Sequence, residues 1–299
     1  MEYTKEPAFI NRHREIEYLQ DWVEQRPEHI LFFYGPKSSG KTTLISKFVD
    51  ERLNDEQQFS VKLFNLREVL IVNYEDFLQR FFQLQDQEEQ DSSETRQYNL
   101  RVFRYTVQTR QKIRDRQLDP FDVMKAELKE QNARGIRPVI IIDELQALDF
   151  IYFNSQRELI KELINFFVAM TKESHLCHVL LSSSDGYFIE KLSNDSKLKK
   201  TAKLFEVDYL PKEDIVYWLN NLEKESKIKD FTLSGTQIDY IWEHFGGSIW
   251  EISSLLGDLL KVFRDGKVED TDLEKIVEGY IVQAKSYFEE YAGLDDAKS

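Results

Sequence analysis

The chain has 299 residues, of which 41% are hydrophobic and 13% aromatic, which is enough to bury the core of one large domain or two ordinary ones. This composition excludes a chain that is disordered along its whole length. The formal net charge of −14 opposes a general attraction to nucleic acids and anionic membranes, so any such contact would have to be local.

Apolar runs rich in Val, Ile, Leu and Phe predict buried strands at residues 29–34, 60–66, 138–143 and 177–183. Amphipathic segments of helical length lie between these runs, as at 42–53 and 156–173. Such alternation is typical of a parallel sheet that is covered by helices on both faces. We therefore expect the N-terminal part of the chain to have an α/β fold.

The first predicted strand leads directly into the pattern G-x-x-x-x-G-K-T, within "FFYGPKSSGKTTLI" at 32–45. A strand before the pattern and an amphipathic helix after it are the setting of a phosphate-binding loop. In such a loop, backbone N–H groups and the helix N-terminus face the phosphates, and a Cβ at Gly40 would hinder that approach. Lys41 is expected to reach the β- and γ-phosphates, and the Thr42 hydroxyl to bind Mg²⁺.

The nucleotide is thus predicted to bind Gly35, Pro36, Lys37, Ser38, Ser39, Gly40, Lys41, Thr42 and Thr43. The alternative is a tight strand-to-helix turn with an incidental lysine.

Two unusual stretches follow. Residues 84–97 are polar and acidic without apolar periodicity, which predicts a surface insertion. The next segment, 96–116, is basic and has Asp115 as its one acidic residue. It either forms a solvated helix face or binds nucleic acid or a partner. Its cationic residues are Arg96, Arg101, Arg104, Arg110, Lys112, Arg114 and Arg116.

Asp143 and Glu144 follow the hydrophobic run "PVIII" at the carboxyl end of the third predicted strand. Ligands of open α/β sheets gather at this edge. Asp143 is expected to hold Mg²⁺ through water and Glu144 to polarise the attacking water, while an acidic helix cap is the alternative. With the phosphate loop, the pair predicts a Mg-nucleotide site and favours hydrolysis over kinase chemistry.

The fourth predicted strand begins beside His175, Cys177 and His178, which are too closely spaced for a tetrahedral zinc site. Cys177 is the one cysteine, so no intramolecular disulfide can form, and this indicates the reducing cytoplasm. No signal peptide is apparent, and the longest apolar runs fall far short of the roughly 20 residues of a membrane span. Lys197, Lys199, Lys200 and Lys203 form either a charged loop or a phosphate contact.

After Leu210 the pattern changes to helices separated by short polar or Gly turns. Pro211 and the acidic residues behind it are helix start signals. We place a domain boundary near 208, which gives a core at 1–208 and an α-helical domain at 209–299.

Seven blocks follow one another along the chain: "FINRHREIEYL" (9–19), "GPKSSGKT" (35–42), "FNLRE" (64–68), "VIIIDELQAL" (139–148), "VLLSSSD" (179–185), "LPKEDIVYWL" (210–219) and "FGGSIW" (245–250). In this order they resemble the archaeal-type ATPase family, in the STAND and AAA+ group of P-loop NTPases. The resemblance covers about residues 8–260 and implies an ATPase core followed by a smaller helical lid, with ATP as the nucleotide.

The resemblance also implies further site residues. Arg12 lies where the family has an arginine near the nucleotide, although Asn11 replaces a family glycine, and a surface ion pair is the alternative. Ser182, Ser183 and Ser184 occupy the place of a polar γ-phosphate sensor in AAA+ proteins. Any of the three could serve, and we select Ser183; a plain serine-rich strand end is the alternative.

Two family-like positions stay open. Arg67 in "FNLRE" is either half of a structural ion pair or catalytic. Gly246 and Gly247 resemble the Gly-Gly block of the lid, but Ile249 stands where a proline is common, and a helix-ending turn is the alternative.

The leading hypothesis is an ATP hydrolase that works as a switch or small motor, in which hydrolysis changes how core and lid sit together. The second hypothesis is a nucleotide-locked binding or scaffold protein with negligible turnover. A protein partner is expected in either case, and nucleic acid has little support. A small-molecule kinase is a third option, for which no acceptor-binding pattern occurs.

Overall fold

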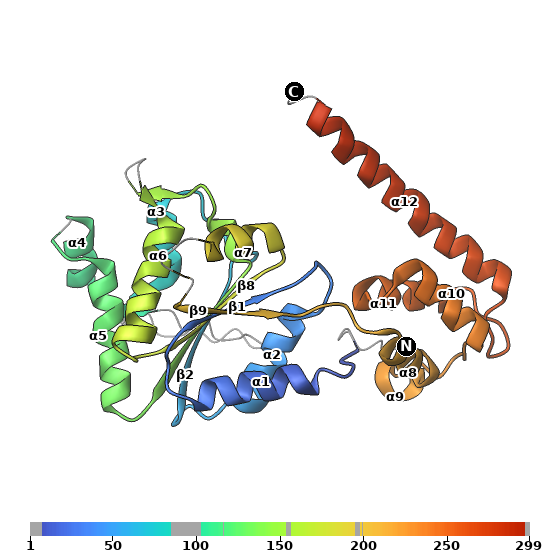
Figure 1. Cartoon of the computed structure of the whole chain (residues 1–299), viewed down its shortest axis with the longest axis horizontal. Coiled ribbons are helices and arrows are strands. Elements are labelled where there is room, and N and C mark those ends of the chain that lie inside the picture. The colour runs from blue at the N-terminus through green and yellow to red at the C-terminus, as the bar shows by residue number, and fades with distance from the viewer. Residues whose placement is uncertain are drawn as a thin grey trace. The chain divides into compact units, whose positions relative to one another are not determined.

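The computed structural model describes residues 8–84, 103–115, 117–153, 157–194, 198 and 200–296. The chain divides into two compact units (Figure 1). The larger unit contains His13–Lys37 and Lys41–Val207. The smaller unit contains the segment that ends at Arg12, the stretch Ser38–Gly40, and the chain from Asp208 onward.

A five-stranded parallel sheet with the order β2-β5-β8-β1-β9 forms the centre of the larger unit. Four of its strands lie where the apolar runs predicted strands, which confirms these strand predictions and the predicted α/β class. The fifth strand, β9, lies at the sheet edge, where its residues are only partly buried and its apolar signal is weak. The strands are β1 (Ile30–Tyr34), β2 (Phe59–Asn65), β5 (Arg137–Asp143), β8 (His178–Ser183) and β9 (Ala202–Glu206).

The register of the sheet aligns the carboxyl ends of four strands. Tyr34 of β1 lies opposite Ser183 of β8, and Asn65 of β2 lies opposite Asp143 of β5. Parallel pairing of β5 with β8 connects these two pairs. The segments that leave the strands at this edge therefore start side by side, although they are far apart in sequence.

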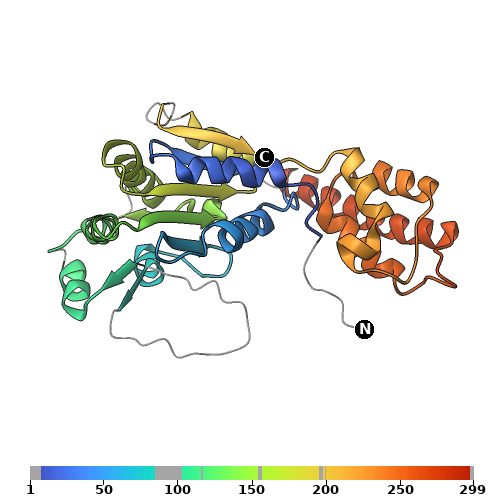
Figure 2. The same ribbon diagram turned by 90° about the horizontal axis from the view of Figure 1, so that it is seen from below.

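Helices cover both faces of the sheet (Figures 1 and 2). Alternate residues of each strand face opposite sides, so Ile30 and Phe32 join a core with residues of α3, α5, α6 and α7. On the other face, Tyr18 of α1 and Phe33 of β1 both contact the ring of Phe205. The covering helices are α1 (His13–Glu24), α2 (Lys41–Arg52), α3 (Tyr74–Phe81), α5 (Pro120–Ala133), α6 (Leu159–Val168) and α7 (Gly186–Ser193).

Smaller elements fill out the larger unit. The helix predicted at 156–173 begins at Leu159 and ends in a π-helical turn, η2 (Ala169–Glu173). Leu84 of the predicted polar insertion ends a strand, and 85–97 lie outside the described residues. The other elements are β3 (Phe82–Leu84), β4 (Phe103–Tyr105), α4 (Val107–Arg114), the 3₁₀ turn η1 (Leu145–Leu148), β6 (Tyr152–Phe153) and β7 (Arg157–Glu158).

The basic segment is described only in part. Arg96, Arg101 and Arg116 lie outside the described residues, and so do Lys197 and Lys199 of the later lysine run. The remainder of the basic segment spans β4 and α4, where the Arg104 backbone N–H donates to Glu127 Oε2 at 2.8 Å.

The smaller unit is helical from Lys212 onward and has a core of its own, built around Trp218. The helix predicted to start near Pro211 ends at Asn220, and a second helix begins at Leu222. The helices are α8 (Lys212–Asn220), α9 (Leu222–Ser226), α10 (Gly235–Phe245), α11 (Ile249–Leu259) and α12 (Asp270–Asp296). Among the described residues, no helix combines the length and apolar character that crossing a bilayer requires.

The two positions Gly246 and Gly247 of "FGGSIW" require glycine for different structural reasons. Gly246 ends α10 with a φ of 54° and donates its N–H to Trp242 O, as a helix-ending glycine does. Gly247 instead lies against the backbone of Leu210, whose N–H donates to Gly247 O at 3.2 Å. A Cβ added to Gly247 would lie 1.9 Å from Leu210 O. Only glycine therefore permits this approach of two backbones.

Gly247→Ala should destabilise the helical unit by about 1–3 kcal/mol, because the clash involves backbone atoms that no side-chain rotation relieves. Gly257→Ala is the matched control, since Gly257 lies inside α11 and a Cβ there meets no atom within 4 Å. The control should stabilise the protein by about 0.5–1 kcal/mol through helix propensity. Urea unfolding of both variants measures the two effects, and equal effects would contradict the packing argument.

His178, a buried histidine at the amino end of the central strand β8, predicts that the stability of the protein depends on pH. His178 packs edge-on against Trp22, with ring centroids 4.9 Å apart. Burial, together with the nearby charge of Arg137, lowers the pKa of His178 to about 3. The unfolded chain binds a proton at this histidine near pH 6.5, whereas the folded chain does not, so stability is lost as the pH falls below about 6.5.

Between pH 7.5 and pH 5.5, His178 should lower the free energy of unfolding by about 1 kcal/mol. Urea midpoints at the two pH values measure it. Because carboxylates also titrate, the relevant quantity is the difference between the wild-type protein and His178→Phe, which keeps a ring against Trp22. A variant with the same pH slope as the wild-type protein would show that His178 is not the source.

Candidate functional site

The loop predicted to bind phosphate runs from β1 to α2 in a conformation that uses its glycines. Gly40 has a φ of 88°, in the left-handed region that favours glycine. A Cβ on Gly35 would lie 2.1 Å from Val207 O, so the loop passes against the chain that leaves β9. Ser38 also has a positive φ, and Ser39 is fully buried. The loop backbone is therefore held at the carboxyl edge of the sheet.

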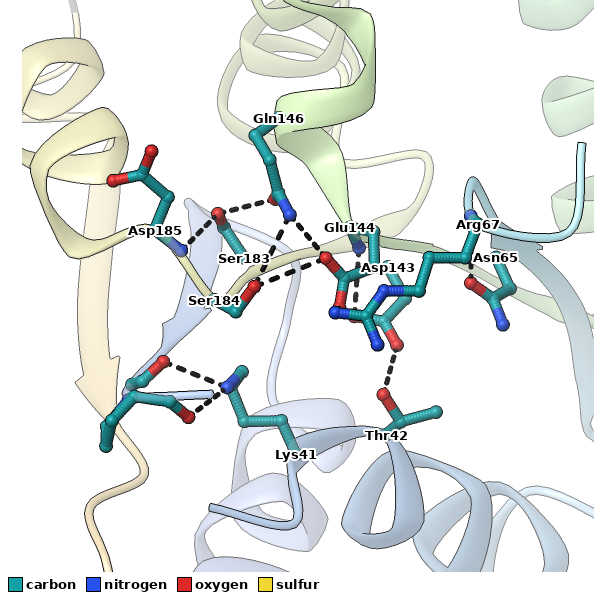
Figure 3. A network of polar contacts seen from close by, with 12 residues as sticks. Lys41, Thr42, Asn65, Arg67, Asp143, Glu144, Gln146, Ser183, Ser184 and Asp185 are labelled. Carbon is teal, nitrogen blue, oxygen red and sulfur yellow. Dashed lines mark hydrogen bonds and ion pairs between the residues drawn. The ribbon is translucent and has the colours of Figure 1, made fainter. Parts of the chain in front are cut away.

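Lys41 begins α2, and its ammonium group turns back into the loop (Figure 3). Nζ donates to Gly35 O at 2.9 Å and to Pro36 O at 2.7 Å. Burial lowers the pKa of Lys41, while Asp143 and Glu144 oppose that shift. The loop thus encloses a cation that faces two carboxylates.

Thr42 and Asp143 meet directly. Thr42 Oγ1 donates to Asp143 Oδ2 at 2.7 Å, and Asp143 Oδ1 accepts the Glu144 backbone N–H at 3.0 Å. A hydroxyl and a carboxylate are the hard oxygen ligands that Mg²⁺ prefers. Thr42 lies on the first turn of α2 and Asp143 ends β5, and their oxygens would suit a Mg²⁺ ion.

Glu144 is buried and lies in the left-handed region, with φ 59° and ψ 45°. For a residue other than glycine this conformation costs about 1–3 kcal/mol and is often found at functional sites. Arg67 forms an ion pair with Glu144 at 2.7 Å, and Gln146 and Ser184 donate hydrogen bonds to the same carboxylate (Figure 3). Arg67 was left open as half of a structural ion pair or as a catalytic residue. The structure shows an ion pair, and its partner is the candidate catalytic glutamate.

The serines that end β8 point in different ways. Ser183 Oγ donates to Gln146 Oε1 at 2.7 Å and accepts the Asp185 backbone N–H at 3.0 Å. Ser184 Oγ donates to Glu144 at 3.3 Å. Ser182 is fully buried, and its hydroxyl has no hydrogen-bond partner within the described chain. Ser183 and Ser184 therefore share a network with Glu144, and Ser182 does not.

Gln146 is the residue of this network to which no role had been assigned. It lies in "DELQ", two residues after Glu144, on the 3₁₀ turn η1. Its amide contacts Glu144, Ser183 and Ser184. A polar side chain two positions after the candidate base is the sequence signal that could have identified it.

Arg12 lies near the loop, where it binds backbone oxygens. Its guanidinium donates to Ser39 O at 2.9 Å and to Asp208 O at 2.7 Å, and the residue is buried. The preceding Asn11 has a φ of 42°, which asparagine tolerates better than most residues. Asn11 can thus replace a glycine, and its amide also donates to Asp214 at 2.7 Å.

Two further predicted loop residues are not buried. Lys37 is exposed and Thr43 is half-buried on the first turn of α2. The His175 ring contacts Pro27 O, Cys177 is buried, and His178 packs on Trp22, so these three side chains point to separate surroundings.

Solved structures with similar folds include the ORC2 protein of Aeropyrum pernix in ADPNP-ADP complexes. The match has a TM-score of 0.58 at 15% identity and covers 93% of this chain and 71% of that chain. An E. coli HORMA:CdnC:Trip13 complex contains another similar chain, with a TM-score of 0.53, 13% identity, and coverage of 91% and 89%. Identities this low show the fold alone, which is the predicted P-loop NTPase fold.

Sequence relatives are more informative. Two uncharacterized ATP-binding proteins of Methanocaldococcus jannaschii are 35% and 34% identical to this chain. The matches cover 78% and 84% of this chain and 68% and 67% of the relatives. A family model described as an ATPase domain predominantly from Archaea matches residues 9–255. The chain therefore belongs to this family of archaeal ATPase domains, whose named relatives are ATP-binding proteins.

Proposed function

We propose that this protein is a Mg²⁺-dependent ATP hydrolase. The observation that carries the proposal is the meeting of four groups at one sheet edge: the loop with Lys41, the Thr42–Asp143 pair, the buried Glu144, and Ser183. They come from the ends of three adjacent strands. Family membership supports the nucleotide, since the relatives are ATP-binding proteins.

Each group has a role that its chemistry suits. Lys41 supplies positive charge to the β- and γ-phosphates, and the loop N–H groups add hydrogen bonds. Thr42 and Asp143 hold Mg²⁺, which neutralises phosphate charge when bound. We assign to Glu144 the role of accepting the proton of the attacking water, and to the Ser183 hydroxyl the role of a donor to the γ-phosphate.

We further propose that the helical unit is a lid that follows the state of the nucleotide. Three loop residues, Ser38–Gly40, belong to the same compact unit as the helices. The Arg12 guanidinium joins Ser39 in the loop to Asp208, where the helical part of the chain begins. A loop that shifts between ATP and ADP would thus move its helical neighbours with it.

A nucleotide-locked binding protein with negligible turnover is the second candidate. The observation that favours it is the Arg67–Glu144 ion pair, because the guanidinium occupies a carboxylate oxygen that an attacking water would need. The net charge of −14 disfavours nucleic acid as the partner in either case, so we propose a protein partner.

Phosphate release from ATP by the purified full chain tests the proposal. With excess Mg²⁺ we expect steady-state turnover, and EDTA should remove it until Mg²⁺ is restored. Binding of ATP without phosphate release at any Mg²⁺ concentration would support the second candidate. Absence of binding would contradict both.

A further inference from the structure

The Gln146 side chain connects two residues to which different tasks are proposed. Its Oε1 accepts a hydrogen bond from Ser183 Oγ at 2.7 Å, and its Nε2 donates to Glu144 Oε2 (Figure 3). Ser183 ends β8, whereas Glu144 directly follows β5, so one amide spans the ends of two neighbouring strands.

The direction of these bonds follows from their donors. The Asp185 backbone N–H can only donate, and it does so to Ser183 Oγ at 3.0 Å, which leaves the serine proton for another acceptor. An ionised Glu144 can only accept, so the NH₂ end of the Gln146 amide has to face it. The amide oxygen then faces Ser183 and takes its proton. Every member of the chain of bonds has one consistent orientation.

Packing does not require these bonds. The η1 turn is anchored by Leu145 and Leu148, which are both fully buried, while Gln146 is only half-buried. The turn would therefore stay in place without the amide. The bonds are better explained by what they do to Ser183 and Glu144.

We infer that Gln146 is a positioning residue that couples the Ser183 hydroxyl to the Glu144 carboxylate, an inference that rests on the proposed nucleotide site. The Ser183 hydroxyl has a single proton. If Ser183 turns that proton toward a γ-phosphate oxygen, Gln146 Oε1 loses its donor and the amide is held only at its Glu144 end. The position of Glu144 then depends on what Ser183 binds, and the coupling acts equally in the reverse direction.

This competition predicts opposite effects on affinity and on turnover. Gln146→Leu frees the Ser183 proton, so a non-hydrolysable ATP analogue should bind about 2- to 10-fold tighter relative to ADP, which is the net effect of one hydrogen bond. Because Glu144 loses its positioning partner, kcat should fall about 10-fold or more without a rise in KM. A residue with only a structural role would weaken both or change neither.

Calorimetric titration of Mg-ADP and of the Mg-bound analogue tests the coupling without turnover. The proteins are wild type, Gln146→Leu, Gln146→Met, Ser183→Ala and the double variant Ser183→Ala/Gln146→Leu. Gln131→Leu is the matched control, since Gln131 also donates to a carboxylate, Glu127 Oε1 at 3.2 Å, but on the distant α5. Thermal unfolding verifies that each variant is folded, and the methionine variant serves if the leucine variant is not.

The inference is supported if loss of Gln146 tightens analogue binding relative to ADP in the wild-type background and has no such effect without Ser183. It is overturned if the ratio of the two affinities is unchanged, or if the shift persists in Ser183→Ala. The hydrolysis proposal fails separately, when wild type binds both nucleotides but releases no phosphate. If neither nucleotide binds, both fail.

Discussion

Lys41→Ala should lower kcat/KM for ATP by about 100-fold or more, because the variant loses the positive charge that compensates phosphate charge during the reaction. Two features of the structure prepare this lysine for the role. It is buried at the base of the loop, and its Nζ is held by Gly35 O and Pro36 O. An ammonium group prepared in this way needs little reorganisation when phosphate binds.

Lys47→Ala is the matched control for that variant. Lys47 lies on the same helix, α2, but its side chain is partly exposed and pairs with Glu51 at 3.6 Å. We expect its kinetics to equal those of the wild-type protein. Because Lys41 also ties the loop together, thermal unfolding of both variants has to precede the kinetics. A folded Lys41→Ala protein with normal kcat/KM would remove the loop from the proposed site.

The parts of the fold and site that the sequence predicted are those in which local pattern and tertiary position agree. Buried strands such as β5 read as continuous apolar runs because both of their faces are covered. The loop at 35–42 needs glycine where the backbone adopts a positive φ or approaches another backbone, and Gly40 and Gly35 meet these needs. Asp143 and Glu144 could be placed because a strand end fixes which residues reach the sheet edge.

Other parts depend on contacts between residues distant in sequence, which no local pattern encodes. Arg67 could not be assigned to Glu144, since the pairing follows from β2 lying beside β5. Arg12 was expected near the nucleotide, and its contacts with Ser39 O and Asp208 O join residues far apart in sequence. The edge strand β9 was not among the predicted runs because Lys203, Leu204 and Glu206 are exposed, which leaves it without a continuous apolar run.

The left-handed backbone of Glu144 links strain to the proposed chemistry. A residue in this conformation persists only where its surroundings hold it, and here Asp143, Arg67 and Gln146 all contact it. The carboxylate is thereby held at the sheet edge, between Arg67 after β2 and Ser184 after β8. A substitution that removes the charge of Glu144 but keeps the size of its side chain therefore tests the role of the charge separately from that of the side-chain position.

Glu144→Gln should lower kcat about 100-fold or more, because the amide keeps the size of the side chain but accepts no proton from the attacking water. ATP affinity should be retained, since the Thr42–Asp143 pair and Lys41 are unchanged. The amide also forms no ion pair with Arg67, which in the wild-type protein lies 2.7 Å from the carboxylate. The variant should thus accumulate with ATP bound.

Single-turnover phosphate release and equilibrium binding of ATP measure the two effects in the same preparation, with the exposed Glu51→Gln as the control. The outcome separates the two candidate functions. In a hydrolytic cycle, only the Glu144→Gln protein holds ATP through many turnover times of the wild type, and a partner specific for the ATP-bound form is captured by that variant alone. In a nucleotide-locked scaffold, wild type and variant hold ATP equally long and capture the partner equally well, because Glu144 then has no proton to accept.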